Sequence, residues 1–200
     1  FPGGVGTAEE ILYLLGVMLH PDNASQPLPM VMTGPASAEP YFRQIDDFVG
    51  RTLGPEAQQR YTIIIDDPAD VAREMSRGLA AVHEFRKHHG DAYYFNWRLA
   101  IDRNFQEPFK ATHESMTALD IREGTKPHEL AANLRRAFSG IVSGNVRDDT
   151  AAAIEEFGPF EINGSARIMA LLDDLLASFV EQRRMKIAAG SYRPCYRVLS

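Results

Sequence analysis

Two short apolar runs, joined by a segment with helical periodicity, constrain the fold of this chain most. The runs "LPMVMT" (28–33) and "YTIIID" (61–66) are bounded by turn residues, as buried strands are. Apolar residues recur at helical spacing over 41–53 between them. Alternating strands and helices predict an α/β fold with a Rossmann-like parallel sheet.

A further helix is expected directly after the second run. Asp67, Pro68 and Asp70 have the residue types that an N-cap, a first helical position and a third helical position favour. The apolar pattern continues to about His89, so we expect a long helix there.

The chain changes character after Gly90, and we predict two domains, 1–90 and 91–200. We expect residues 1–90 to be the second half of a Rossmann-like nucleotide-binding domain and residues 91–200 to be a mainly helical C-terminal extension. Within the extension we expect an extended segment from Tyr93 to Ile101 and a loop-like stretch to about Thr125. Helices are expected from Pro127 and over about 166–186.

The first residues are expected to follow a strand, because a glycine loop of this kind is normally fed by a buried one. Phe1 falls where that strand should end, and two parallel strands alone make a poor sheet. We therefore expect this chain to be the carboxyl-terminal piece of a longer protein.

Charge and composition exclude several classes of protein. The net charge is -6, which argues against a nucleic-acid partner, and no apolar run is long enough to span a membrane. The single cysteine, Cys195, cannot form an internal disulfide and fits a reducing, cytoplasmic setting. The histidines show no metal-ligand spacing, so we predict no metal site.

The stretch "GGVGTAEE" at the front of the chain carries the strongest chemical signal. It is not a Walker loop, because no Lys-Ser/Thr pair follows the glycines, and Glu9 stands where a dinucleotide fingerprint needs a small residue. What remains is a nest of backbone N–H groups at a helix N-terminus, which suits one phosphate. Gly3, Gly4 and Gly6 open the nest, and the Thr7 hydroxyl could add a donor.

The two acids that follow the loop allow two interpretations. In one, Thr7 is an N-cap and Glu10 completes a capping box. In the other, Glu10 stands one turn below the phosphate and reaches the attached sugar. Glu9 is structural in both, and apo Glu10 could also alternate between the two roles.

"PGGVGTAEE" (2–10) resembles the PGGxGTxxE motif of the LOG family of nucleotide phosphoribohydrolases, and the rest of the first ninety residues is similar to that family. The extension, including "NLRRAFSGIVSGNV" (133–146), resembles its larger bacterial subgroup, the pyrimidine/purine nucleotide 5′-monophosphate nucleosidases. The resemblance implies hydrolysis of the N-glycosidic bond of nucleoside monophosphates to free base and ribose 5-phosphate.

The resemblance also assigns residues and partners. It implies Glu10 as the catalytic residue, no metal or redox cofactor, and a homo-oligomer, a dimer or a tetramer, with a guanosine alarmone as effector. The motif arginine and a second glycine-rich stretch of the family lie upstream of this motif. The alternative is a non-catalytic nucleotide-sensing module. The family resemblance implies a phosphate loop that consists of Gly3, Gly4, Val5, Gly6 and Thr7.

Three further features have structural and functional interpretations. Arg135 and Arg136 could bind a phosphate or form a solvated helix face. The aromatic residues of 93–97 could stack on a base or form a buried strand face. Tyr41 is expected near the carboxyl edge of the sheet, where ligands bind.

Overall fold

The computed structural model describes residues 1–90, 99–185 and 192–199. The chain divides into two compact units, and each is described by itself. Unit 1 contains Phe1–Pro2 and Val17–Asp102, and unit 2 contains Gly3–Gly16 and Arg103–Ser200. The helix α1 (Val5–Met18) belongs to unit 2 up to Gly16. The domain boundary predicted at residues 90 and 91 adjoins residues outside the described ranges, and it stays a prediction.

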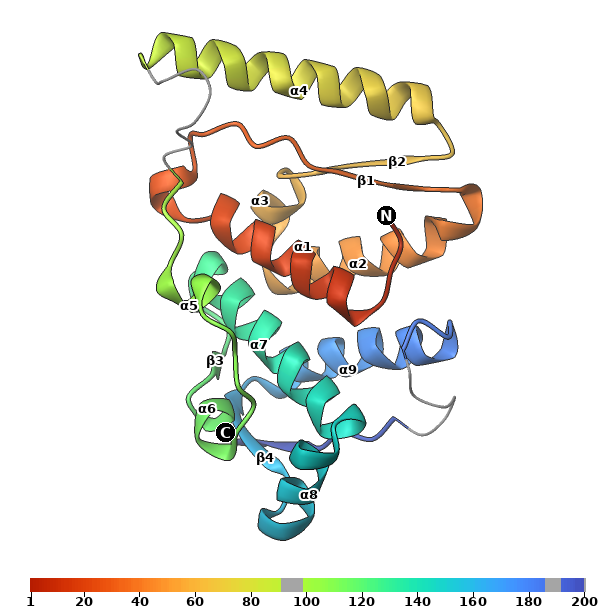
Figure 1. The fold of residues 1–200 in the computed structure, drawn as a ribbon, viewed down its shortest axis with the longest axis vertical. Helices are drawn as coiled ribbons and strands as arrows, with labels where there is room; N and C mark the ends of the chain where they lie inside the picture. The colour runs from red at the N-terminus through yellow and green to blue at the C-terminus, as the bar shows by residue number, and fades with distance from the viewer. Residues whose placement is uncertain (91–98, 186–191, 200) are drawn as a thin grey trace. The chain divides into compact units, whose positions relative to one another are not determined.

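Unit 1 is built on a pair of parallel strands. β1 (Val31–Gly34) pairs with β2 (Thr62–Ile65), with Val31 opposite Thr62 and Gly34 opposite Ile65. Figure 1 shows α4 on one side of this pair and α2 with α3 on the other. The helical elements of the unit are η1 (Pro21–Asn23), η2 (Ala36–Ala38), α2 (Glu39–Thr52), α3 (Pro55–Gln58) and α4 (Pro68–His88).

The helices of unit 1 begin and end as their sequences dictate. Asp67 caps α4, because its Oδ1 accepts a hydrogen bond of 2.8 Å from the Asp70 backbone N–H. The apolar stripe of α2, which includes Phe42, Ile45 and Val49, is buried. Both strands and both long helices of this unit were therefore predicted correctly, although β1 begins at Val31 rather than Leu28.

Hydrogen bonds of Asn23, in the helical turn η1, join this turn to the last described residues of unit 1. The Asn23 amide donates to Val17 O (2.7 Å) and Ala100 O (2.8 Å), and its Oδ1 accepts from the Ala100 N–H (2.8 Å). These bonds satisfy the amide inside the protein, where it is 1% exposed.

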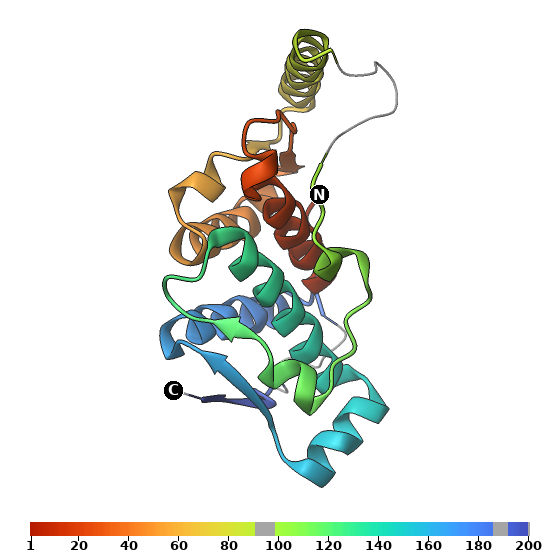
Figure 2. The same cartoon turned by 90° about the vertical axis from the view of Figure 1, so that its left-hand side faces the viewer.

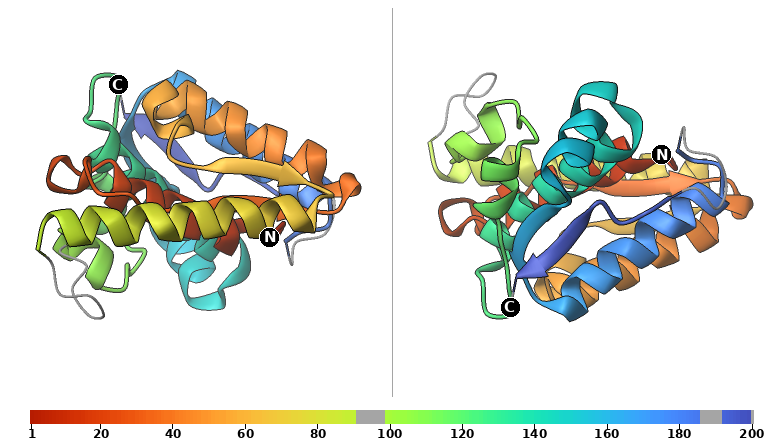
Figure 3. Two further views of the ribbon diagram at one scale, coloured as in Figure 1. Left: turned by 90° about the horizontal axis from the view of Figure 1, so that it is seen from above. Right: turned by 90° about the horizontal axis from the view of Figure 1, so that it is seen from below.

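Unit 2 combines helices with a second parallel sheet. The sheet has the order β3 (Asp120–Ile121), β4 (Phe160–Gly164), β5 (Tyr196–Leu199), with both pairs parallel. α7 contacts β3 and α6 contacts β4 (Figure 2). Figure 3 (right) shows α9 next to the pair formed by β4 and β5. Besides the first part of α1, its helices are α5 (Arg103–Gln106), α6 (His113–Thr117), α7 (Pro127–Val146), α8 (Asp148–Phe157) and α9 (Ala166–Glu181).

The core of unit 2 lies on the apolar stripes of α7 and α9. Leu134, Phe138, Leu172 and Phe179 are each 0% exposed. The mainly helical prediction for this half is confirmed, but the three-stranded sheet was not predicted. Its strands are short, and β3 and two short helices fall in the stretch that was expected to be a loop. The segment expected to be extended falls largely on 91–98, outside the described residues.

Parallel strands with flanking helices in both units confirm the α/β, Rossmann-like fold class. Among the described residues, no helix is long and apolar enough to cross a membrane.

Candidate functional site

The glycine loop leads directly into α1, and its backbone opens the helix. α1 begins at Val5, and Ala8 N–H donates its first helical hydrogen bond to Gly4 O (3.2 Å). The N–H groups of Val5, Gly6 and Thr7 precede this bond and belong to the helix N-terminus, which attracts anions. Loop and helix thus present, at one helix end, backbone N–H groups that no helical hydrogen bond uses, and the binding of a phosphate there stays a prediction.

The capping-box interpretation is wrong. Thr7 is the third residue of α1 and not its N-cap, because the glycines allow the helix to begin earlier. Glu9 and Glu10 consequently lie beyond the first turn, which contains no acidic residue. Glu10 therefore does not occupy the position from which a capping box is completed.

Gly3 and Gly4 are held in place by contacts that leave no room for a side chain. A Cβ at Gly3 would collide with the Thr7 side chain, and one at Gly4 would collide with the backbone carbonyl of Arg184. Arg184 also donates from Nη1 to Gly3 O (3.3 Å). Gly6 differs, because a Cβ there would meet nothing within 4 Å. The packing of the chain therefore does not explain why residue 6 is a glycine.

Arg184 was not found by sequence reasoning. It follows α9, far along the chain from the loop, and only the folded unit 2 brings the two together. No local spacing signals such a contact.

One face of α1 lines an open cavity of about 520 Å³. Gly6 and Glu10 are four residues apart, so they share this face, and Glu9 and Tyr13 belong to it as well. Arg135 of α7 completes the wall. The cavity has the size of small-molecule sites in proteins. It joins the end of the glycine loop to the carboxylate that the sequence singled out.

Glu9 lies in the same cavity as Glu10, although the sequence analysis separated their roles. Glu10 is exposed and Glu9 is partly buried. The pKa of Glu9 is raised to about 7, mainly by burial; the Arg135 guanidinium lowers it and the Glu10 carboxylate raises it.

Arg135 is held by aromatic rings. Its guanidinium carbon lies 5.5 Å from the Tyr13 ring centroid and 5.9 Å from that of Phe105. The two rings meet edge to face with centroids 5.1 Å apart. Arg136 lies over Phe109, at 5.7 Å, and burial lowers the pKa of its guanidinium. Of the two arginines, Arg135 is thus the one that lines the cavity.

Unit 1 carries a second cavity, of about 390 Å³, at the carboxyl ends of its strands. Thr33 and Gly34 end β1 there, and Asp66 follows β2 with a left-handed φ of 57°. Ligands of parallel-sheet proteins bind at this edge. Tyr41, expected nearby, is buried in α2, with its ring edge-on to Phe42.

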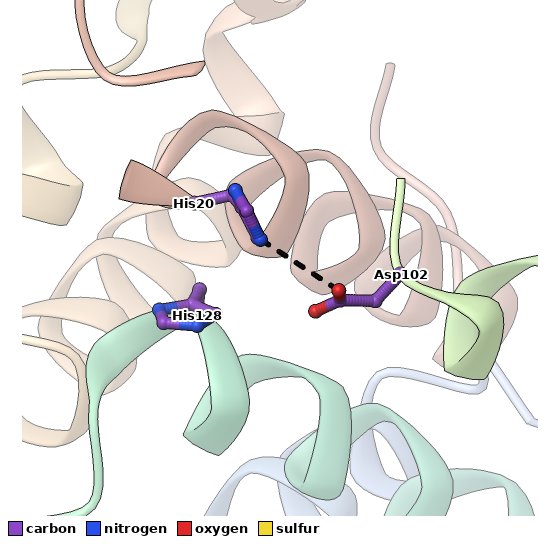
Figure 4. Close-up of side chains that lie close together, drawn as sticks. All are labelled: His20, Asp102 and His128. Atoms are coloured by element: carbon purple, nitrogen blue, oxygen red, sulfur yellow. Dashed lines mark ion pairs between the residues drawn. The ribbon is translucent and has the colours of Figure 1, made fainter. Parts of the chain in front are cut away.

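Two of the histidines, for which the sequence predicts no metal site, contact other groups of the protein. His113 Nε2 lies 2.8 Å from Gly158 O, and His20 Nε2 lies 3.6 Å from Asp102 Oδ1 (Figure 4). The aromatic residues of 93–97 lie outside the described residues.

Fold and site define an α/β protein with a glycine-rich loop at a helix N-terminus. Comparison with known proteins makes this specific. Residues 79–199 match the family model described as "Pyrimidine/purine nucleotide monophosphate nucleosidase, C-terminal", and residues 1–75 match the one described as "Possible lysine decarboxylase". The chain belongs to the pyrimidine/purine nucleotide monophosphate nucleosidase family.

Two curated relatives support this membership. The proteins named pyrimidine/purine nucleotide 5′-monophosphate nucleosidase from Escherichia coli K12 and from Escherichia coli O157:H7 are each 52% identical to this chain over 198 residues. The match covers 99% of this chain and 44% of each relative. The chain thus spans less than half the length of these curated relatives.

Proposed function

We propose that this protein hydrolyses the N-glycosidic bond of nucleoside 5′-monophosphates, giving free base and ribose 5-phosphate. One observation carries the proposal: Gly6 of the phosphate loop and the carboxylate of Glu10 line a single cavity, one helical turn apart. Family membership and the name of the relatives support the same reaction.

The phosphate is placed at the N-terminus of α1. Gly3, Gly4, Val5, Gly6 and Thr7 form its site, in which backbone N–H groups and the Thr7 hydroxyl donate hydrogen bonds. Each charge-assisted bond is worth about 1.5–3 kcal/mol. Held there, the phosphate fixes the ribose against the next turn of the helix and supplies binding energy remote from the reacting bond.

Glu10 is the catalytic residue of the proposal. Cleavage of the glycosidic bond builds positive charge on the ribose ring, and a carboxylate beside the ring stabilises that charge. Glu10 is exposed on the cavity and lies beyond the first turn, so its charge does not oppose the phosphate at the helix end. It also holds the ribose hydroxyls and orients the attacking water.

The partners of the site belong to the same proposal. Family resemblance supports a homo-oligomer, a dimer or a tetramer, acting in the cytoplasm and regulated by a guanosine alarmone. Light scattering of the purified protein tests its oligomeric state. Base release measured with and without the alarmone tests the regulation.

The experiment is release of free base from AMP, GMP, CMP and UMP by the intact protein. We expect Glu10→Gln to lower kcat by about 10²–10⁴-fold, the range that one acid–base group contributes. Glu84→Gln, which neutralises an exposed carboxylate on α4, is the matched control and should leave kcat unchanged. Near-normal turnover by Glu10→Gln would refute the assignment. Tight nucleotide binding without base release would instead identify a sensing module.

A further inference from the structure

The two neighbouring glutamates of α1 share a cavity but not an environment. Glu9 is partly buried and lines the cavity together with Arg135 of α7, and Glu10 is exposed. Within the described ranges, the charged and titratable groups that face Glu9 are Glu10 and Tyr13 on its own helix and Arg135 on α7. From α5, the uncharged ring of Phe105 contacts the Tyr13 ring edge to face.

The burial of Glu9 favours the neutral form of its carboxyl group. Burial raises the pKa of Glu9 to about 7, so that a proton is present on it over much of the neutral range. Glycoside hydrolysis uses two carboxyl groups in a single site, one of which donates a proton to the leaving group.

The proposed reaction needs a proton donor besides the carboxylate that stabilises the ribose. When the bond between C1′ and the base nitrogen breaks, its electron pair goes to the base. A nucleobase leaves far more easily when it takes up a proton at the same time. Glu10, exposed and placed at the ribose, does not meet this need.

We propose that Glu9 is the general acid of the reaction and that it delivers its carboxyl proton to the departing base in the cavity it shares with Glu10. The inference rests on the proposed function. As the C1′–N bond breaks, the Glu9 O–H proton moves to the base, and the base leaves neutral. Water then adds to C1′ of the oxocarbenium ion and its proton passes to the Glu9 carboxylate, which restores the acid. The balance is nucleoside monophosphate plus water to base plus ribose 5-phosphate.

Arg135 acts through Glu9 and is a positioning residue. Its guanidinium, stacked over Tyr13 and Phe105, limits how far burial raises the pKa of Glu9. Its replacement by a neutral residue therefore raises the proton affinity of Glu9, and the pH range in which Glu9 can donate a proton extends upward.

The test compares two substrates of the intact protein. One is a nucleoside monophosphate, and the other is 4-nitrophenyl ribofuranoside 5-phosphate, whose nitrophenolate leaves without a proton. We expect Glu9→Gln to lower kcat on the nucleotide about 100-fold or more, and to leave kcat on the nitrophenyl substrate within about twofold. Glu10→Gln should impair both, and Glu84→Gln neither. Far-UV circular dichroism verifies that each variant folds.

The pH profile gives a second readout. In the wild type, kcat on the nucleotide should fall as the pH rises through about 7, because Glu9 then loses its proton. Arg135→Gln should move this fall to higher pH, Glu9→Asp should retain a fall, and Glu9→Gln should abolish it.

Equal effects of Glu9→Gln on both substrates, or an unchanged pH profile, would overturn the role of Glu9 and leave the proposed function intact. Absence of base release from the nucleotide by the wild-type protein would instead remove the proposed function, and full activity of Glu10→Gln on both substrates would remove only the role of Glu10.

Discussion

The N-termini of α1 and α4 differ in the kind of residues that form them. α4 follows the strand β2, and α1 follows the glycine loop, which is expected to come after a strand. α4 opens with Asp67 as its cap, Pro68 first and Asp70 third, so its own side chains satisfy the helix end. At the same positions α1 has Gly4, Val5 and Thr7, with no acid in the first turn. A closed helix end, whose N–H groups are satisfied by the helix's own side chains, stabilises the fold. An open end, whose N–H groups lack such a side-chain partner, can receive an anion.

Conversion of the α1 end into the α4 type should have the largest effect. Thr7 and Asp70 occupy the third position of their helices. Thr7→Asp puts a carboxylate against the proposed phosphate, and at a separation of about 4–5 Å the repulsion is worth about 3 kcal/mol. We expect the affinity for ribose 5-phosphate to fall about 100-fold, while stability rises slightly through the helix dipole. Isothermal calorimetry measures the affinity, and Ala69→Asp on α4 is the control.

Alanine substitutions of two glycines at the N-terminus of α1 should separate effects on stability from effects on phosphate affinity. Gly4→Ala places a methyl group against the Arg184 carbonyl, and overpacking of this kind costs about 1–3 kcal/mol of stability. Gly6→Ala has open space, so the helix should gain up to about 1 kcal/mol while phosphate affinity falls. Urea unfolding and calorimetry on both variants check this. Equal loss of stability in the two would contradict it.

Removal of the α4 cap should affect stability alone. Asp67→Ala deletes the hydrogen bond that Asp67 Oδ1 accepts from Asp70 N–H, and such a loss costs about 1 kcal/mol. Base release should not change, because α4 takes no part in the proposed site. A drop in kcat in this variant, measured at a temperature where it stays folded, would show that the closed end has a role in catalysis.

The smallest effect expected is a pH dependence of stability that comes from Glu9. Its pKa is about 7 in the folded chain and has the ordinary value of 4.5 when unfolded. The stabilisation from its proton is complete below pH 4.5 and is lost as the pH rises to about 7. Because solvent still reaches the group, we expect a change on the order of 1 kcal/mol. Urea unfolding of Glu9→Gln should show a flatter profile over this range.

Local sequence signals predicted the N-terminus of α4 completely and that of α1 only in part. Short-range preferences predicted the Asp67 cap, strands over 28–33 and 61–66 and a helix from Pro127. The structure has the cap, a strand at each of the two places and the helix. Thr7 was misplaced, because two glycines let the helix start earlier than a hydroxyl cap would. The contact of Arg184 with the loop, the placement of Arg135 in the cavity and the three-stranded sheet depend on contacts between distant segments, which no local pattern encodes. Arg135 itself was a candidate from the sequence, but its position in the cavity was not predicted.

The most direct test of the central claim is an NMR titration of the intact protein, labelled with ¹⁵N in glycine and aspartate, with ribose 5-phosphate. The account predicts that the amide signals of Gly4 and Gly6 shift, with a saturable dependence on concentration that ribose alone does not reproduce. The Asp70 amide, already bonded to Asp67, should stay in place. Unmoved glycine signals at a saturating concentration, or shifts at Asp70 as large as those at Gly6, would contradict the claim that the open end of α1 is the phosphate site.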